Sequence, residues 1–372
     1  MGVLITSGDL CAAPFTLHAV IISNTPLPDG TRLAPFSLYG LSNNGTVLVT
    51  GASTVSAFAS AYTQFGRVIG TGDVVGGIEI QNVLSAAINN SDQVLINAQR
   101  ASGGYGIFSS SAQLLGTGQA VGGSTISHFP EERLGWNDSG EAAVSSVLTS
   151  GAGIVTTTGI SIVLGDILGG IQIQAVGPVS LADNGRVAFV GNAGFSGVFD
   201  QNGLVYGPGR NIGGRTIQSY DGRPDINNAG EIAVTGIFPG GNGVYTSNRI
   251  VGESGQVLGG RQLTGVALRP DINAVNQVAY LGFYSGGEAV YLDSQLVADR
   301  GFLVDGRTIL SIDQEPLVND LGQVAFRASL DDGSMAIILA TPDVQVPEPA
   351  TWELTLGIGL VLLARKATDY FA

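Results

Sequence analysis

The sequence predicts an all-β fold, a seven-bladed β-propeller with about 46 residues and four strands per blade. Three observations lead to this prediction. One turn motif recurs seven times, a second glycine-containing element recurs at the same interval, and the two ends of the repeated region supply complementary strands. Short β-branched runs bounded by Gly, Asn and Asp are typical of strands and turns, and no helical period is evident before the C-terminal segment.

The recurring turn has the pattern Asn-x-x-Gly. Its copies are "LSNNGTVLV", "INNSDQVLI", "WNDSGEAAV", "LADNGRVAF", "INNAGEIAV", "INAVNQVAY" and "VNDLGQVAF". The residues at the Gly position are Gly45, Asp92, Gly140, Gly185, Gly230, Asn276 and Gly322, and five turns begin with Asn89, Asn137, Asn227, Asn273 and Asn319. We interpret these residues as scaffold rather than as a ring of ligands. An Asn side chain bonds its own backbone two residues on, Gly takes positive φ, and Asn and Asp tolerate positive φ next best.

The second element is a Gly-Gly or Asp-Gly turn followed by a strand. Its copies are "LPDGTRL", "VVGGIEI", "AVGGSTI", "ILGGIQI", "NIGGRTI", "VLGGRQL" and "LVDGRTI". Each unit therefore contains this turn, a strand, the Asn-x-x-Gly turn and three further strands, which is the size of one propeller blade. "GTGDVVGG" at 70 and "GTGQAVGG" at 116 belong to the same element, so we do not interpret them as phosphate loops, which must open a helix.

The ends of the repeated region predict how the ring closes. The last unit has strands near Arg307, Gln323 and Met335 and then lacks its fourth, whereas the chain begins with an orphan strand from Leu17 to Ser23. A propeller in which N-terminal and C-terminal strands share one blade explains both features and removes exposed strand edges. A β-solenoid, or an array of sandwiches, is the alternative.

Composition excludes several classes of function. The chain of 372 residues has 16 basic and 30 acidic residues and a net charge of −14, which disfavours nucleic acid as a partner. A single cysteine, Cys11, and two distant histidines, His18 and His128, exclude a thiol metal site. Turn carboxylates such as Asp73 and Asp166 form no dense calcium-binding series, so we predict no metal, no cofactor and no catalytic residue.

The pentapeptide Arg-Pro-Asp-Ile-Asn occurs twice, at residues 223–227 and 269–273. We interpret it as the best-preserved part of the scaffold motif, with Pro fixing the entry into the turn and Asn starting it. The scaffold leaves Arg223, Arg269, Asp225 and Asp271 unexplained, either as exposed charges or as pairs between blades.

The pattern divides the chain into four regions. Residues 1–14 lack the basic start and long apolar run of a signal peptide, and we expect a degenerate or truncated leader there. Residues 15–341 form the propeller, residues 342–349 a linker with a Pro-Glu-Pro motif, and residues 350–372 a hydrophobic sorting or anchor helix with a basic tail. The apolar run 350–364 would span about 22 Å as a helix, short of the roughly 30 Å hydrocarbon core of a bilayer.

The C-terminal segment "VPEPATWELTLGIGLVLLARK" resembles the PEP-CTERM sorting signal of Gram-negative bacteria. The resemblance rests on Pro347, Glu348 and Pro349, the apolar run, and the basic Arg365 and Lys366. Glu353, the short basic cluster and the six residues that follow it depart from the usual form. The resemblance implies recognition by an exosortase-type membrane protease, a transient inner-membrane stage, and delivery to the cell surface or the exopolymeric matrix.

The repeats resemble a set of bacterial exported proteins with tandem Asn-x-x-Gly-x-x-Ala-Phe repeats and a choice of C-terminal anchors. Ala188-Phe189 and Ala325-Phe326 carry the ending of that motif. The resemblance implies an extracellular repeat protein without an established reaction. We therefore expect a non-enzymatic binding or structural module that contacts extracellular polysaccharide. The alternatives are a propeller enzyme that acts on glycans through a channel-facing carboxylate pair, and a carbohydrate- or calcium-dependent adhesion module.

Overall fold

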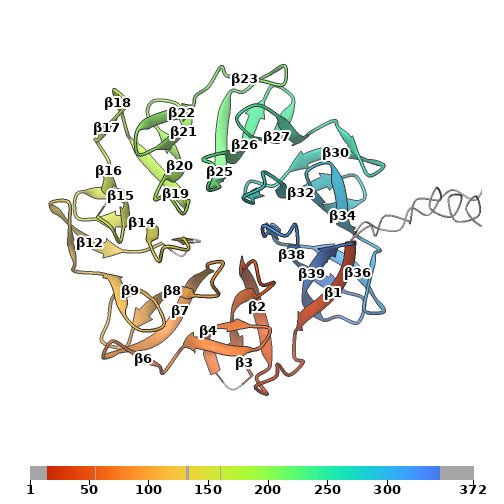
Figure 1. Ribbon diagram of the computed structural model, residues 1–372, viewed down its shortest axis with the longest axis horizontal. Helices are drawn as coiled ribbons and strands as arrows, with labels where there is room; N and C mark the ends of the chain where they lie inside the picture. Colours follow the sequence, from red (N-terminus) through yellow and green to blue (C-terminus); the bar gives the residue numbers. More distant parts are fainter. Residues whose placement is uncertain (1–14, 55, 131–133, 160, 344–372) are drawn as a thin grey trace, which may run out of the picture. The chain divides into compact units, whose positions relative to one another are not determined.

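The structure, a computed structural model, describes residues 15–54, 56–130, 134–159 and 161–343. These residues form small antiparallel sheets arranged in a ring of seven around a central axis, as Figure 1 shows. The prediction of an all-β, seven-bladed propeller is therefore confirmed, and the solenoid and sandwich alternatives are wrong. The predicted C-terminal helix lies outside the described residues.

Each blade runs from an innermost strand to an outermost one. Blade 1 contains β2 (Leu33–Leu41), β3 (Val47–Ser53), β4 (Ser56–Thr63) and β5 (Gly66–Gly70). Blade 2 contains β7 (Ile78–Ile88), β8 (Val94–Arg100), β9 (Tyr105–Phe108) and β10 (Gln113–Gly116). Blade 3 contains β12 (Ser124–His128), β13 (Gly135–Trp136), β14 (Ala142–Leu148), β15 (Gly151–Thr156) and β16 (Ser161–Val163). Blade 4 contains β19 (Ala175–Leu181), β20 (Val187–Asn192), β21 (Ser196–Asp200) and β22 (Gly203–Tyr206).

The remaining blades follow the same order. Blade 5 contains β25 (Ser219–Ile226), β26 (Ile232–Phe238), β27 (Gly241–Tyr245) and β28 (Ile250–Glu253). Blade 6 contains β30 (Arg261–Val266), β31 (Asp271–Ile272), β32 (Val278–Tyr284), β33 (Gly287–Leu292) and β34 (Gln295–Asp299). Blade 7 contains β36 (Arg307–Ile312), β37 (Leu317–Val318), β38 (Val324–Leu330), β39 (Met335–Pro342) and β1 (Phe15–Ile22). In blades 3, 6 and 7 the innermost strand is divided into two segments.

Short strands at the Gly-Gly and Asp-Gly turns lead into the blades from the perimeter of the ring (Figure 1). They are β6 (Val74–Val75), β11 (Ala120–Val121), β17 (Ile167–Leu168), β18 (Ile171–Gln172), β23 (Asn211–Ile212), β24 (Arg215–Thr216), β29 (Val257–Leu258) and β35 (Leu303–Val304). The predicted second element is thus a two-stranded turn. For example, the turn between β6 and β7 contains Gly76 and Gly77 at φ 57° and 81°, and the chain continues directly into β7.

The N-terminal strand closes the ring. Strand β1 pairs with β39, so that blade 7 takes its outermost strand from the start of the chain. The backbone N–H of Ser23 donates to the carbonyl of Met335 at 2.8 Å, just beyond the end of β1. The predicted closure by strands from both ends is confirmed, and no blade is left short of a strand.

The hydrophobic core lies between neighbouring blades. Leu48 and Ala61 of blade 1 pack in one buried cluster with Ile96 and Phe108 of blade 2, and each cluster of this kind joins the facing sides of two sheets. Burying apolar area there is the main favourable term that holds the blades together. The core is therefore a set of wedges around the ring rather than one central mass.

Polar side chains on the second strand of several blades cross these wedges. Thr235 Oγ1 donates to the carbonyl of Ala267 at 2.9 Å, and Ser145 Oγ donates to the carbonyl of Gly177 at 3.0 Å. Asn97 and Arg327 make the corresponding bonds to Pro130 and Phe36. Each bond gives a partner to a carbonyl on the inner side of the next blade, either on its innermost strand or between the two segments of that strand.

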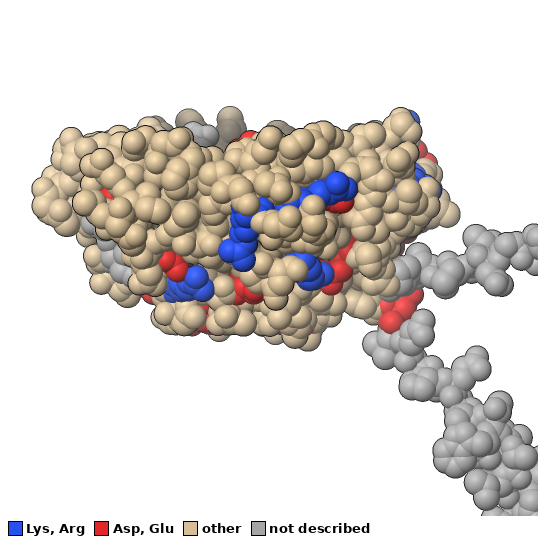
Figure 2. All heavy atoms as spheres, turned by 90° about the horizontal axis from the view of Figure 1, so that it is seen from above, with Lys and Arg blue, Asp and Glu red and all other residues tan. Residues whose placement is uncertain are grey.

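Arginine is the basic residue of the propeller, since the one lysine of the sequence is Lys366. Figure 2 shows one edge of the ring, where Arg atoms lie beside Asp and Glu atoms. Ion pairs in the described part of the chain include Arg215 with Glu253 and Arg261 with Asp299, both at 2.7 Å. Guanidinium groups suit such pairs because they donate two parallel hydrogen bonds to one carboxylate.

Candidate functional site

The Asn-x-x-Gly turns surround one end of the central channel and bond to one another. The side-chain amide of each turn Asn donates to the backbone carbonyl of the corresponding residue in the next blade. The bonds run from Asn89 to Asn137 (3.1 Å), Asn137 to Ala182 (3.1 Å), Asn227 to Asn273 (2.9 Å), Asn273 to Asn319 (2.9 Å) and Asn319 to Ser42 (2.9 Å). The last bond joins blade 7 to blade 1. The side chains at the first turn position, which could have formed a ring of ligands, instead join the blades.

The same Asn side chains also shape their own turns. Asn227 Oδ1 accepts the backbone N–H of Ala229 at 3.1 Å and of Glu231 at 3.0 Å. The residues at the Gly position have φ between 60° and 80°, namely Gly45, Asp92, Gly140, Gly185, Gly230, Asn276 and Gly322. Left-handed backbone of this kind favours Gly and is next best tolerated by Asn and Asp. Both ends of the Asn amide are therefore engaged within the scaffold.

A second polar ring lies one residue further along the turns. There a backbone N–H donates to the side chain at the same position in the next blade. The bonds run from Asn43 to Asn90 (3.2 Å), Asn90 to Asp138 (2.7 Å), Asp138 to Asp183 (2.8 Å), Asp183 to Asn228 (2.8 Å), Ala274 to Asp320 (2.7 Å) and Asp320 to Asn43 (2.9 Å). Blade 5 lacks this bond because Ala274 offers no acceptor. These side chains border a cavity of about 180 Å³ at the channel mouth.

The repeated pentapeptide also connects blades. Asp225 accepts the backbone N–H of Ile272 at 3.0 Å, and Asp271 accepts that of Val318 at 2.8 Å. Arg223 Nε donates to the carbonyl of Val179 in the preceding blade at 3.1 Å. These three side chains thus connect blades through hydrogen bonds to backbone groups, whereas Arg269 is exposed.

The channel holds a second cavity, of about 150 Å³, deeper than the turns. Residues of blades 1 to 3 that have small side chains border it, among them Gly40, Ala87 and Gly135. Asp225 and Arg223 of blade 5 line the same cavity. It therefore combines hydrogen-bond donors and acceptors at the centre of the ring, and it is the strongest candidate for a binding site in the described chain.

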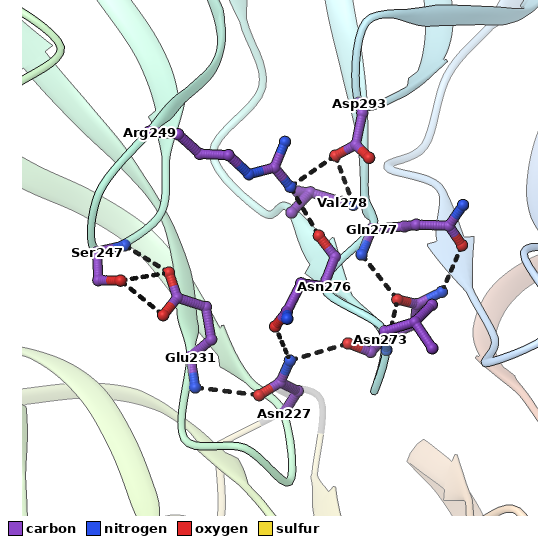
Figure 3. A network of polar contacts seen from close by, with 10 residues as sticks. Asn227, Glu231, Ser247, Arg249, Asn273, Asn276, Gln277, Val278 and Asp293 are labelled. Carbon is purple, nitrogen blue, oxygen red and sulfur yellow. Dashed lines mark hydrogen bonds and ion pairs between the residues drawn. The ribbon is translucent and has the colours of Figure 1, made fainter.

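A polar network links blades 5 and 6 beside the turns (Figure 3). Glu231 accepts from the backbone N–H of Ser247 at 2.7 Å and from its hydroxyl at 2.6 Å, while Arg249 donates to the carbonyl of Asn276 at 2.6 Å. Burial alone would raise the pKa of Glu231, but the hydrogen bonds from Ser247 outweigh burial and lower it. Asn227 donates to Asn276 Oδ1 at 2.8 Å, which joins this network to the turn ring.

The sorting-signal residues Pro347, Glu348, Pro349, Arg365 and Lys366 lie outside the described residues, as does the expected leader in residues 1–14. Among the described residues no helix is long and apolar enough to cross a membrane. No group of three or more His, Cys, Asp or Glu side chains in that part of the chain is arranged to hold a metal ion.

The two histidines lie apart on the propeller. His18 Nδ1 is 3.1 Å from Asp305 Oδ1 in blade 7, and the ring of His128 packs against Tyr105 at a centroid distance of 4.6 Å. Neither lies near the other, so the structure brings together no pair of histidines for metal binding or proton transfer.

Sequence reasoning did not identify the cavity-lining Gly40, Ala87 and Gly135, although they occupy one column of the repeat, two residues before the first turn position, which is Ser42, Asn89 and Asn137 in these blades.

Comparison with known proteins gives no family. No protein-family model matches the chain, and no curated protein matches it. Among solved structures, virginiamycin B lyase from Staphylococcus aureus is 10% identical with a TM-score of 0.41, and covers 87% of this chain and 99% of its own. A streptogramin B lyase is 10% identical with a TM-score of 0.42, covering 88% and 98%. BBS1N in complex with ARL6DN is 11% identical with a TM-score of 0.42, covering 90% and 98%. Similarity at this level supports no argument about the activity or ligands of the chain.

Proposed function

We propose that this protein is an exported β-propeller that binds extracellular polysaccharide at its central channel, either at the cell surface or in the matrix. An exosortase-type protease sorts it through the C-terminal Pro347-Glu348-Pro349 segment. The observation that carries the binding role is the pair of polar cavities along the channel of a closed ring. The resemblance of residues 346–366 to a sorting signal supports the route of export.

The interblade bonds support a binding role because they make the channel a preorganised site. The turns at its mouth are tied to their neighbours in most blades, so a ligand would pay little to order them. Recognition sites of this kind combine a fixed scaffold with a few converging polar groups.

Binding and sorting can be tested separately. The full-length chain should bind immobilised bacterial exopolysaccharides in a saturable way, and an absence of binding across a broad glycan panel would remove the binding role. In a bacterium with an exosortase-type protease, deletion of residues 347–372 should retain the protein in the cell. If the truncated protein still reached the surface, the sorting role would be wrong while the binding role stood.

A glycan-cleaving enzyme is the second candidate, because Asp225 and Asp271 line the same cavity. Glycoside hydrolysis commonly uses two carboxylates on either side of the scissile bond. Both carboxylates here accept a backbone N–H of the next blade, which favours a structural role for them. Release of reducing ends from a bound polysaccharide, abolished in Asp225→Asn, would support the enzyme.

A further inference from the structure

The backbone N–H that precedes each turn Asn points toward the channel side of its strand. Ile226, Ile272 and Val318 pair with Ile232, Val278 and Val324 on the second strands, in a register that leaves this N–H free of the ladder. In blades 5 to 7 a side chain of the preceding blade accepts it. Ser180 Oγ accepts from Ile226 at 3.3 Å, Asp225 from Ile272 at 3.0 Å, and Asp271 from Val318 at 2.8 Å.

Blades 1 to 4 have the same register without these acceptors. The equivalent residues Leu41, Ile88, Trp136 and Leu181 pair with Val47, Val94, Ala142 and Val187. The positions that would supply the acceptor are Leu317, Gly40, Ala87 and Gly135, none of which has a polar side chain. Among the described side chains, none accepts these four inward N–H groups.

The cavity of about 150 Å³ lies where the acceptors are missing. All four uncapped residues line it, together with Gly40, Ala87 and Gly135. A Cβ atom at Gly40 would lie 2.4 Å from Ile88 Cγ2, and one at Gly135 would lie 2.8 Å from Leu181 Cβ, so glycine there lets the neighbouring blades approach closely. One wall therefore offers backbone donors. On the other side Asp225 uses its two oxygens to accept from Ser180 at 2.5 Å and from Ile272 at 3.0 Å, and a carboxylate can accept about four bonds in all.

We propose that this cavity binds a neutral sugar unit. The hydroxyl oxygens of the sugar accept from the uncapped N–H groups of blades 1 to 4, which are those without a side-chain acceptor. A hydroxyl group both accepts and donates, so the same ligand can donate to Asp225 on the acceptor wall. The protein contains an example of this contact, because Ser180 Oγ accepts from the equivalent backbone N–H of Ile226.

The charged side chains of the lining disfavour an anionic ligand. They are two carboxylates, Asp225 and Asp271, and one guanidinium, Arg223, so a carboxylate ligand would meet a net negative charge across the cavity. Trp136 also lines the cavity; its indole packs against the core between blades 2 and 3, and the indole N–H donates to the carbonyl of Gln93 at 3.0 Å. This inference rests on the proposed function and assigns its binding site and the chemistry of its ligand.

The test is Ala87→Ser, which supplies the missing hydroxyl from within the chain. The added Oγ should accept from the backbone N–H of Trp136, as Ser180 Oγ does from Ile226. It should therefore take the place of a ligand hydroxyl in the cavity. Calorimetric titration of the full-length protein with neutral oligosaccharides should show binding that weakens at least tenfold in Ala87→Ser. Ala229→Ser, on an exposed turn outside this cavity, is the matched control and should bind as the original does.

The possible outcomes separate the two proposals. If folded Ala87→Ser and the original protein bound neutral oligosaccharides with equal affinity, the sugar would bind elsewhere. The proposed binding site would then be wrong, while the binding function would stand. An absence of saccharide binding by the original protein would overturn both. Preferential binding of uronate oligosaccharides over neutral ones would overturn the neutral ligand. Circular dichroism melts confirm that each variant is folded before its affinity is compared.

Discussion

Arg261 holds the carboxylate of Asp299, a residue with 0% solvent exposure, through a hydrogen bond of 2.8 Å from Nε to Oδ2. The Tyr284 hydroxyl donates to the other carboxylate oxygen at 2.5 Å. Arg261 follows the Gly-Gly turn that leads into blade 6, and Asp299 ends the outermost strand of that blade. The pair therefore fastens the entrance of the blade to its outer edge, as Arg215 and Glu253 do in blade 5.

Replacing Arg261 should be costly because a buried charge would lose its partner. Arg261→Met is expected to lower the free energy of unfolding by about 3–5 kcal/mol. Arg307→Met is the matched control, because Arg307 and Asp332 form a pair that is exposed on both sides, so its loss should lower the free energy of unfolding much less. Chemical denaturation measures both values, and equal losses in the two variants would contradict the role of burial.

The turn ring is incomplete in blade 4, where Ala182 takes the place of Asn. Asn at that position should donate to the carbonyl of Asn227, as Asn227 does to Asn273 at 2.9 Å. Ala182→Asn should therefore raise the free energy of unfolding by about 1 kcal/mol. The converse variant, Asn227→Ala, should lower it by about 2 kcal/mol, because two bonds to blade 6 and the hydrogen bonds within its own turn are lost. A destabilised Ala182→Asn protein would mean that blade 4 has no room for the amide.

Gly222 lies where the backbones of blades 5 and 6 approach closely. Its φ is 78°, and a Cβ atom there would lie 1.8 Å from the carbonyl oxygen of Leu268. Gly222→Ala should destabilise the protein by at least about 3 kcal/mol, because the backbone must move in addition to the usual cost of positive φ. Gly214 has φ 85° and open space around it, so Gly214→Ala should cost only about 1 kcal/mol. Thermal melts of the two variants make the comparison.

Acid should weaken the network between blades 5 and 6. The pKa of Glu231 is lowered from 4.5, so its contribution to stability is fully present above pH 4.5 and is lost as pH falls through the lowered value. At neutral pH the free energy of unfolding of the original protein should exceed that of Glu231→Gln by about 1 kcal/mol. That difference should shrink toward zero in acid, as measured by urea unfolding at a series of pH values. A difference that stays constant down to pH 3, roughly the lower end of carboxylate titration, would show that the carboxylate charge is not responsible.

Much of the fold could be predicted because the repeat marks it directly. A turn that needs positive φ leaves Gly, Asn or Asp at a fixed interval, and an orphan strand at one end matches a missing strand at the other. Local chemistry therefore predicted both the blade and its closure. The C-terminal sorting signal stays a prediction, because residues 347–366 lie beyond the described chain.

The candidate site was harder to predict, because its chemistry is expressed between blades. Asn89 could be recognised as a turn residue, but its bond to the carbonyl of Asn137 depends on how two sheets meet. Gly40 and Ala87 are unremarkable residues in the sequence, and they matter only because Ser180 and Asp225 fill the same column elsewhere. Aligning the repeats and comparing that column would have revealed the difference, but the direction toward the next blade requires coordinates.

The bond from Asn319 to Ser42 gives the ring a property that linear repeat proteins lack. A solenoid has first and last repeats that must be sealed from solvent by special sequences. Here every repeat has a neighbour on both sides, so the contacts around the ring do not depend on where the chain begins and ends. A chain reopened in any exposed loop, with strands β1 and β39 joined by a linker, would be a different polypeptide with the same circle of contacts.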